Sequence, residues 1–211
     1  MHVVSVQVGS PQVLDLGSRS VTTGIHKQAV DQVTLEKVGI TGDAVVNTKH
    51  HGGPDQAVYV YSAADYSWWQ QQLDRPIEPG TFGENLTVSN APETVRIGDR
   101  IRVGGAFLEV TAARIPCATF AARMGEPGWI RRFRDANRPG YYCRVLQTGT
   151  VRPGDPMQWT AAPEANISLD EMVAHFYATE VPLPDVRRAL SSPIAVRSRA
   201  EYEARLPSSD H

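Results

Sequence analysis

The chain has few cysteines. Only two of its 211 residues are cysteine, Cys117 and Cys143, so at most one disulfide could form. Small secreted domains that depend on disulfides carry several pairs, and the sequence therefore excludes a disulfide scaffold. We expect both thiols to be reduced.

The sequence also lacks a long apolar run and an excess of positive charge. No stretch approaches the roughly 20 apolar residues that cross a bilayer, and the N-terminus MHVVSVQVG lacks the basic and apolar regions of a signal peptide. We expect no membrane contact and a cytoplasmic location. Lys plus Arg number 21 against 23 Asp plus Glu, a net charge of -2. This balance argues against nucleic acid as a partner.

What is present predicts a strand-rich globular body. Hydrophobic residues make up 41% of the chain, enough for a core, and the length fits one enlarged domain or a domain with a small appendage. Alternating apolar residues predict a first strand at 3–8, followed by a turn-rich loop. Gly104-Gly105 predicts a hairpin. With further strands expected at 58–61, 85–88, 143–149 and 157–159, the pattern favours a closed or nearly closed β-barrel.

Helical patterns interrupt and then follow the strands. In the body, peripheral helices are expected at 62–73, at about 118–123 with Gly125 as the stop, and at about 129–135. After TAAPEAN (160–166) strand signals vanish. Two S-x-x-E capping boxes, at Ser168 and Ser198, and a first-turn proline predict helices at 168–178, 184–191 and 198–205.

The fold class is therefore expected to be mainly β with α, in two domains. Residues 1–162 would form the barrel and 163–211 a three-helix appendage. The apolar positions of the appendage are too few for a core of its own, so it must dock on the body or on a partner.

Two glycine-rich segments could bind a ligand. HHGG (50–53) precedes a strand and GTFGEN (80–85) leads into one, and glycines let backbone amides approach a ligand closely. Each segment is also explained by a sharp turn with polar side chains. Adjacent histidines point in different directions on an extended chain, which disfavours a His-His metal pair.

The segment ARIPCATFAARMG (113–125) is more specific, because a strand ends there at a Pro-Cys step that opens a helix. Unpaired amides at a helix N-terminus favour a thiolate, and Arg114 and Arg123 would add to this effect at Cys117. The alternative is an inert buried thiol, which is commoner for a lone cysteine. Cys143 is expected in the core, and Lys27 either holds an anion or is solvated.

Taken in order, six motifs resemble the MOSC family, named for the C-terminal domain of molybdenum cofactor sulfurases. These motifs are GITGD, HHGGPDQAVYVY, PGTFGENLTV, IGDRIRVGGAFLEVT, RIPC and PGYYCRV, and the resemblance spans about residues 20–160. The helical appendage resembles the three-α domain of the YiiM-like bacterial subgroup. Standard signatures such as a nucleophile elbow, a Walker loop or zinc-ligand spacing are absent from the sequence.

The resemblance implies a β-barrel that carries the molybdenum cofactor (molybdopterin), which is labile and often lost on purification. It makes Cys117 the metal ligand and the catalytic residue. It assigns cofactor binding to Lys27, His51, Gly52, Gly53, Asp55, Glu84, Asn85 and Arg114. One departure is Gln56, where relatives commonly have Lys, which puts a cationic role at this position in doubt.

The resemblance further implies an oxidoreductase that reduces N-hydroxylated compounds, such as N-hydroxylated purines, for detoxification. A separate reductase would supply the electrons, and a homodimer is left open. The leading alternative is a non-catalytic carrier of the cofactor or of its sulfur, with Cys117 as the attachment site. A nucleic-acid adaptor is a third class. Residues 166–211 contain five Arg and no Lys against seven Asp plus Glu, and this negative balance argues against it.

Overall fold

The computed structural model describes residues 1–48 and 51–207. Lys49, His50 and residues 208–211 lie outside the described residues, so the first histidine of the HHGG segment is not described. The strands found are β1 (Val3–Gly9), β2 (Gln12–Asp15), β3 (Ser20–Thr23), β4 (Lys27–Val30), β5 (Val33–Glu36), β6 (Gly39–Ile40), β7 (Val58–Ser62), β8 (Leu86–Val88), β9 (Arg100–Val103), β10 (Ala106–Ala113), β11 (Tyr141–Gln147), β12 (Gly149–Val151) and β13 (Met157–Thr160). The helices are the 3-10 helix η1 (Pro54–Gln56), α1 (Ala63–Leu73), α2 (Ala118–Met124), α3 (Trp129–Ala136), α4 (Leu169–Tyr177), α5 (Leu183–Ser191) and α6 (Val196–Glu203).

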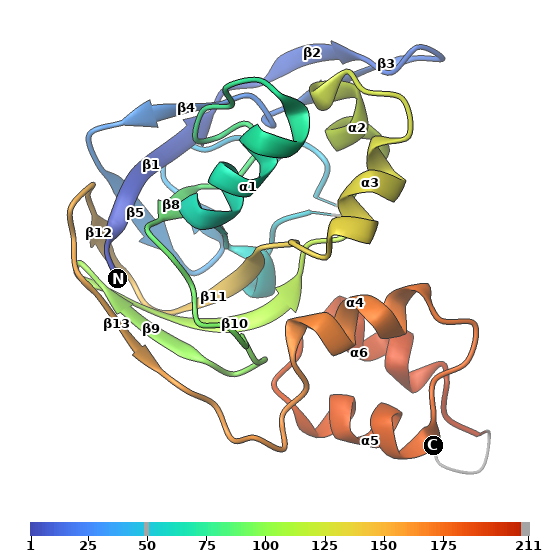
Figure 1. Cartoon of the computed structure of the whole chain (residues 1–211). Coiled ribbons are helices and arrows are strands. Elements are labelled where there is room, and N and C mark those ends of the chain that lie inside the picture. The colour runs from blue at the N-terminus through green and yellow to red at the C-terminus, as the bar shows by residue number, and fades with distance from the viewer. Residues whose placement is uncertain (49–50, 208–211) are drawn as a thin grey trace.

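Strands form one large sheet and two small ones. The large sheet has the order β13-β9-β10-β11-β7-β8-β1-β4, and β12-β5-β6 and β2-β3 form the others. The β9–β10 hairpin turns at Gly104, which has a φ of +53°, as the glycine pair predicts. The expected combination of a strand-rich body, peripheral helices and a three-helix end is confirmed (Figure 1).

A closed barrel is not formed by the described residues. The large sheet keeps two edges, β13 and β4, because the chain leaves it after β4 and β5 pairs with β12 instead. An isolated bridge between His2 and Pro156 and backbone hydrogen bonds beside it link the start of β1 to the segment before β13 without a paired strand. The body is thus a strongly curved, open sheet.

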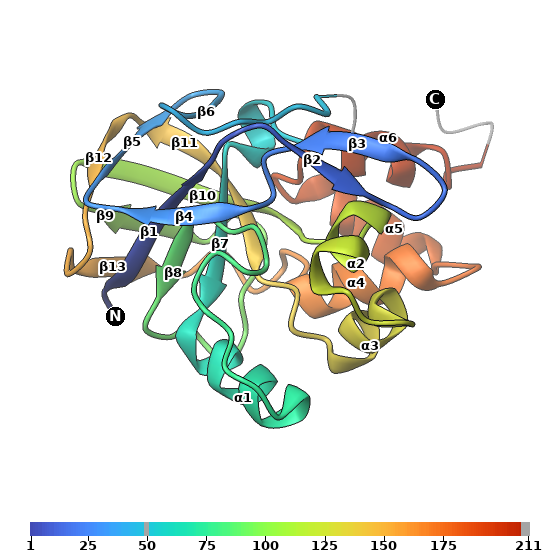
Figure 2. The ribbon, with the colours of Figure 1, turned by 90° about the horizontal axis from the view of Figure 1, so that it is seen from above.

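The turn-rich loop predicted after residue 9 is wrong, because this region contains β2 to β6. The β2–β3 hairpin lies beside α2, as Figures 1 and 2 both show. The predicted strand at 143–149 is two strands in different sheets, β11 and β12. None of the helices in the described ranges is long and apolar enough to cross a membrane.

A cluster of aromatic side chains joins α1, α2 and α3 to the sheet. Trp69, Phe82, Phe120, Trp129 and Phe133 are each at most 2% exposed. The Phe120 ring lies 5.7 Å from Phe82 and 5.0 Å from Phe133, centroid to centroid. Burial of such large rings dominates local packing energy, and it fixes the start of α2 against the sheet.

The C-terminal helices dock on the body rather than forming a separate core. Apolar residues of α4 and α5, such as Leu169, Met172 and Val186, belong to the same buried cluster as the strand residues Val110 and Ala112. Below, "tail" means residues 163–207 and "body" means residues 1–162. The domain boundary itself remains a prediction.

Helix starts in the tail were predicted with mixed success. Ser168 and Glu171 form the expected capping box at α4, and Pro184 lies in the first turn of α5. The second predicted capping box is wrong, because α6 begins at Val196 and Ser198 lies inside it. The amide of Val196 instead donates to Asp55 Oδ2 at 2.8 Å, so a contact with the body sets the start of this helix.

Candidate functional site

Cys117 lies where β10 has ended and α2 begins. It is the N-cap residue of α2, with an extended backbone (φ −127°, ψ 170°), and its side chain makes no capping hydrogen bond. The thiol is partly exposed, whereas Cys143 on β11 is fully buried. Burial raises the pKa of Cys143, which suits the core role that its alternating strand predicts.

A cavity of about 410 Å³ opens beside Cys117. We call it the Cys117 cavity. It brings together six of the nine predicted site residues, which come from separate parts of the chain: Lys27, His51, Gly52, Asn85, Arg114 and Cys117. Gly53, Asp55 and Glu84 do not line it.

Arg114 is the principal cation of this cavity. The residue is only 6% exposed, and its guanidinium carbon lies 4.8 Å from the centroid of Tyr59 and 4.4 Å from that of Phe120. Within the described ranges its Nε has no hydrogen-bond partner. A buried guanidinium with an unused donor is costly unless an anion binds it, so Arg114 is suited to hold one.

Lys27 and Asn85 both contact Asp43, a residue that the sequence patterns did not single out. The Lys27 Nζ forms an ion pair with Asp43 Oδ1, and the Lys27 side chain is 7% exposed. Asn85 Nδ2 donates to Asp43 Oδ2 at 3.0 Å, and the amide of Gly9 donates to Asp43 Oδ1 at 2.7 Å. Burial lowers the pKa of Lys27, and the adjacent Asp43 carboxylate opposes that shift. The network fixes three segments around the cavity.

Glycine residues allow the backbone segments of the cavity wall to pack closely. A Cβ at Gly24 would lie 2.0 Å from the carbonyl oxygen of Ala44, so only glycine allows these backbones to touch. Gly52 has a φ of +70°, which favours glycine, and a Cβ there would lie 2.8 Å from a methyl of Val45. The loops at 24 and at 51–53 therefore pack on the 43–47 segment along one side of the cavity.

The three predicted residues outside the cavity support its frame. Glu84 is fully buried, and its Oε1 accepts hydrogen bonds from the amide of Gly80 and the hydroxyl of Tyr66 at 2.6 and 2.7 Å. Burial raises the pKa of Glu84, and these bonds oppose the shift. Gly53 is the N-cap of η1. Asp55 pairs with Arg144 at 3.0 Å and accepts from the first residue of α6, so it ties this loop to the tail.

His51 lies where the body meets the tail. Burial and the nearby charges of Arg114 and Arg197 lower its pKa to about 4, so the imidazole is neutral at pH 7. At the departure from the family pattern, Gln56 Oε1 accepts a hydrogen bond of 2.8 Å from Arg197 Nη1. Arg197, a residue of the tail, thus brings a positive charge to this position.

Tyr142 is a second residue of the cavity that was not among the predicted site residues. Its side chain lines the Cys117 cavity, and its ring packs on Tyr59 with centroids 4.9 Å apart. Burial raises the pKa of Tyr142, so its phenol keeps the proton at neutral pH. Both Asp43 and Tyr142 lie within motifs that carry the family resemblance. Arg123, expected to assist the thiolate, does not line the cavity.

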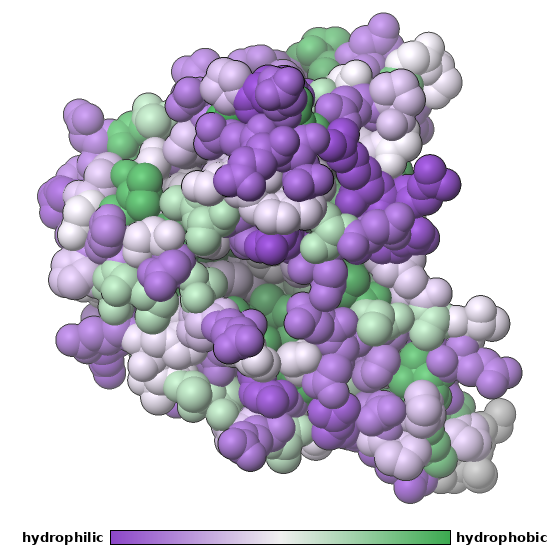
Figure 3. Space-filling view, viewed as in Figure 1, coloured by the Kyte–Doolittle hydropathy of each residue, from purple (hydrophilic) through white to green (hydrophobic). Residues whose placement is uncertain are grey.

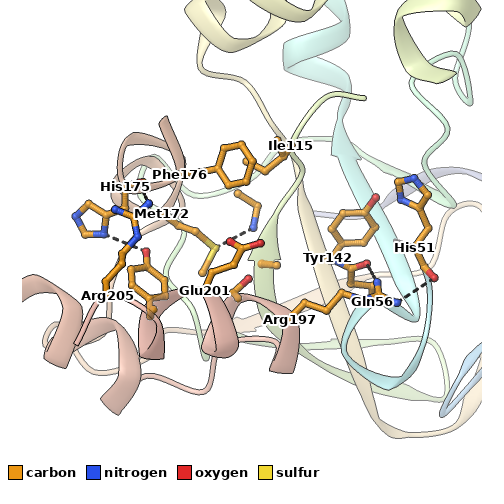
Figure 4. Close-up of a pocket in the computed structure, with 14 residues that line it drawn as sticks. His51, Gln56, Ile115, Tyr142, Met172, His175, Phe176, Arg197, Glu201 and Arg205 are labelled. Carbon is orange, nitrogen blue, oxygen red and sulfur yellow. Dashed lines mark hydrogen bonds between the residues drawn. The ribbon is translucent and has the colours of Figure 1, made fainter. Parts of the chain in front are cut away.

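A second cavity, of about 300 Å³, lies on the tail side and shares four residues with the first: His51, Gln56, Ile115 and Tyr142 (Figure 4). We call it the tail cavity, because α4 and α6 supply most of its other lining residues. On the face drawn in Figure 3 the surface is mostly hydrophilic, with hydrophobic side chains visible where body and tail meet.

The described residues contain no group of three or more His, Cys, Asp or Glu side chains that could hold a metal ion. A metal bound at Cys117 would therefore have a single protein thiolate and would need other ligands from elsewhere.

Comparison with known proteins agrees with this geometry. The model of the MOSC domain, a domain associated with the molybdenum cofactor, matches residues 47–158. The uncharacterized protein YflK of Bacillus subtilis is 37% identical over 169 residues, which cover 79% of this chain and 76% of YflK. A protein of Gibberella moniliformis named reductase is 34% identical over 151 residues, which cover 68% of this chain but 26% of that protein.

A solved structure is similar over almost the whole chain. The crystal structure of YiiM from Geobacillus stearothermophilus superposes with a TM-score of 0.80 at 26% identity, covering 98% of this chain and 99% of that one. The likeness thus includes the tail as well as the body. The matched residues include most of those that line the Cys117 cavity, and the chain belongs to the MOSC domain family.

Proposed function

We propose that this protein binds the molybdenum cofactor in the Cys117 cavity and reduces N-hydroxylated compounds with two electrons from a separate reductase. One observation carries the proposal: the partly exposed thiol of Cys117 shares a cavity with Arg114, a buried cation whose Nε has no hydrogen-bond partner among the described residues. A thiolate suits a soft transition metal, and a buried guanidinium suits a phosphate.

The residues present fit an organic cofactor better than a bare metal ion. The site offers one thiol and no three-residue cluster of metal-ligating side chains in the described ranges, so the metal would bring its remaining ligands with it. Arg114 would hold the anionic end of the group, and Lys27, which pairs with Asp43, lines the same cavity. When bound, the cofactor supplies the two-electron chemistry that cleaves the N–O bond.

The overall reaction is R–NH–OH plus two electrons and two protons, giving R–NH2 and water. Tyr142 is suited to donate a hydrogen bond to the N-hydroxyl oxygen, because its phenol keeps its proton at neutral pH and lines the cavity beside Cys117. His51 is neutral there and is able to donate or accept a hydrogen bond to the substrate nitrogen. The body would orient the substrate and the tail would limit the access of water.

The test is metal and pterin analysis of the protein purified from a cofactor-producing host, together with turnover of an N-hydroxylated purine driven by reduced methyl viologen. We expect bound molybdenum and turnover in the native chain. Both should be lost in Cys117→Ala, whose unfolding midpoint should stay close to that of the native chain because the thiol is partly exposed.

The carrier role is the second candidate, favoured by the accessibility of the Cys117 thiol from the cavity. It predicts Cys117-dependent binding of the cofactor or of its sulfur without turnover. A protein that binds neither molybdenum nor pterin, carries no sulfur at Cys117 and does not turn over would contradict both candidates.

A further inference from the structure

A hairpin that the sequence patterns did not predict forms part of the wall of the Cys117 cavity. Strands β2 and β3 form this hairpin, and Arg19 lies in the turn between them. Arg19 lines the cavity together with Leu16 and Val21 of the same hairpin. The hairpin belongs to none of the six family motifs and precedes the matched residues 47–158, so its role is not one that the resemblance implies.

Arg19 is a cation without a partner in the protein. The residue is exposed, and its guanidinium forms no hydrogen bond or ion pair with any described residue. Asp15 is the one carboxylate of the hairpin. It does not line the cavity, and it accepts a hydrogen bond of 2.8 Å from the amide of Gly17. The charge of Arg19 therefore remains available to a ligand.

The other charges of the Cys117 cavity have partners or lie deeper. Lys27 pairs with Asp43, which is the only carboxylate among the described residues that line the cavity. Arg114 is 6% exposed and so lies at the inner end, whereas the exposed Arg19 lies at the opening. In the proposed function Arg114 holds the anionic end of the cofactor. Arg19 then remains as an uncompensated cation, and such a charge attracts anions.

The opening also carries apolar side chains. Val45 and Val46 line the cavity, and they are 39% and 44% exposed. Leu16 and Val21 of the hairpin are half-buried in the same lining. Apolar surface together with one unpaired guanidinium suits a ligand that has an apolar part and an oxyanion group.

We propose that Arg19 binds an oxyanion group of the substrate, a carboxylate or a phosphate, at the opening of the Cys117 cavity, so that the protein prefers anionic substrates to neutral ones of similar size. The apolar part of the substrate packs on Val45 and Val46, and its reactive end points inward to Cys117. This inference rests on the proposed function for the reactive end of the ligand, whereas the selection of an anion rests on the residues that line the cavity.

The test is equilibrium binding of phenyl phosphate, benzoate and benzyl alcohol to the full-length chain from a cofactor-producing host, measured by isothermal titration calorimetry. We expect both anions to bind at least about tenfold more tightly than the alcohol. Arg19→Gln should weaken both anions about fivefold, which corresponds to about 1 kcal/mol, and leave the alcohol unchanged. The anion that loses more affinity identifies the preferred group. Arg75→Gln, at an exposed arginine that lines neither cavity, is the control and should bind like the native chain.

A second pair of variants locates the bound anion. Val46→Asp places a carboxylate at the opening and should weaken both anions by repulsion, with little effect on the alcohol. Val13→Asp adds the same charge on β2 at a residue that is 74% exposed and does not line the cavity, so binding should stay native. Both valines are exposed, so folding should be preserved. Equal weakening in the two variants would overturn the inference, because the anion would then respond to net charge alone.

The remaining outcomes separate this inference from the proposed function. A preference for anions that survives in Arg19→Gln would overturn it, since Arg114 would then be the cation that binds. Loss of molybdenum and pterin from Arg19→Gln would also overturn it, because Arg19 would then hold the cofactor. Arg19-dependent anion binding in a protein that reduces no N-hydroxylated compound would contradict the proposed function and leave this inference standing.

Discussion

The two cavities meet at His51 and Tyr142 but are built in different ways. The Cys117 cavity is lined by residues of the body alone. Its Lys27 and Asp43 side chains are buried and held by an ion pair and a hydrogen bond from Asn85, and Arg114 is buried. The tail cavity takes Phe176 and Glu201 from short helices, and both residues are exposed.

The two cavities therefore suit different kinds of ligand. Buried charge is costly and survives where a fixed partner or ligand compensates it, which suits a resident group. An exposed aromatic ring and an exposed carboxylate bind and release a ligand at lower cost, which suits a ligand that must leave. Substitutions of buried residues around Cys117 should therefore change what the protein retains, and substitutions of exposed residues should change which ligand it accepts.

The largest expected effect separates the two thiols. Cys117 is partly exposed in its cavity, whereas Cys143 is 0% exposed on β11 and reacts only when the protein opens. We expect a maleimide reagent to label Cys117 at least about 1,000-fold faster under native conditions, since opening of core strands is rare. Labelling of single-cysteine variants measures this directly. Faster labelling of Cys143 would break the assignment of the open cavity to Cys117.

Arg114→Met tests whether the body cavity is built to retain an anionic group. Methionine preserves apolar contact with Tyr59 and Phe120 but removes the charge. We expect molybdenum and pterin content to fall by about 10- to 100-fold, while the unfolding midpoint stays constant or rises, because a buried charge with an unpaired donor is removed. The control is Arg102→Met. Arg102 is exposed, and its guanidinium carbon lies 4.4 Å from the centroid of the Phe107 ring. Unchanged retention in the Arg114 variant would refute its role.

Asp55→Ala probes the boundary between the regions. The sequence placed Asp55 with the cofactor, whereas its carboxylate pairs with Arg144 and caps α6. We expect a loss of about 1–2 kcal/mol in unfolding free energy, from the lost hydrogen bonds to a partly exposed group, with molybdenum content preserved. Chemical denaturation and metal analysis measure both. Loss of molybdenum would restore the cofactor role, and Asp31→Ala, at an exposed aspartate, serves as the control.

Much of the fold follows from local patterns. The β9–β10 hairpin is found because two alternating runs flank Gly104-Gly105, and α2 is found because a Pro-Cys step opens it and Gly125, in the left-handed region, closes it. Strands β2 and β3 were missed because each has only four residues and they pair with each other at the exposed surface. Short, polar strands give no periodic signal.

The site is less predictable than the fold, because its contacts join distant segments. The motif GITGD contains Asp43, but nothing local shows that Lys27 and Asn85 meet it. Gln56 is hydrogen-bonded by Arg197, 141 residues later in the chain. The start of α6 likewise depends on Asp55 rather than on a local capping box. Tertiary packing determines these contacts between distant residues, and a single sequence does not show them.

The smallest expected effect concerns the tail at acid pH. Hydrogen bonds from Arg188 lower the pKa of Glu171 to about 2, against an ordinary value of 4.5. Because the folded-state pKa is depressed, the ion pair stabilises the tail fully above pH 4.5, and its contribution is lost as the pH falls toward 2. The pair is about one-third exposed, so we expect it to contribute no more than about 1 kcal/mol. Glu171→Gln should therefore lower the unfolding midpoint at pH 7, and the difference should shrink below pH 4.5 and almost vanish near pH 1, as measured by circular dichroism. An equal difference at both pH values would show that Glu171 acts through the shape of its capping box with Ser168 rather than through its charge.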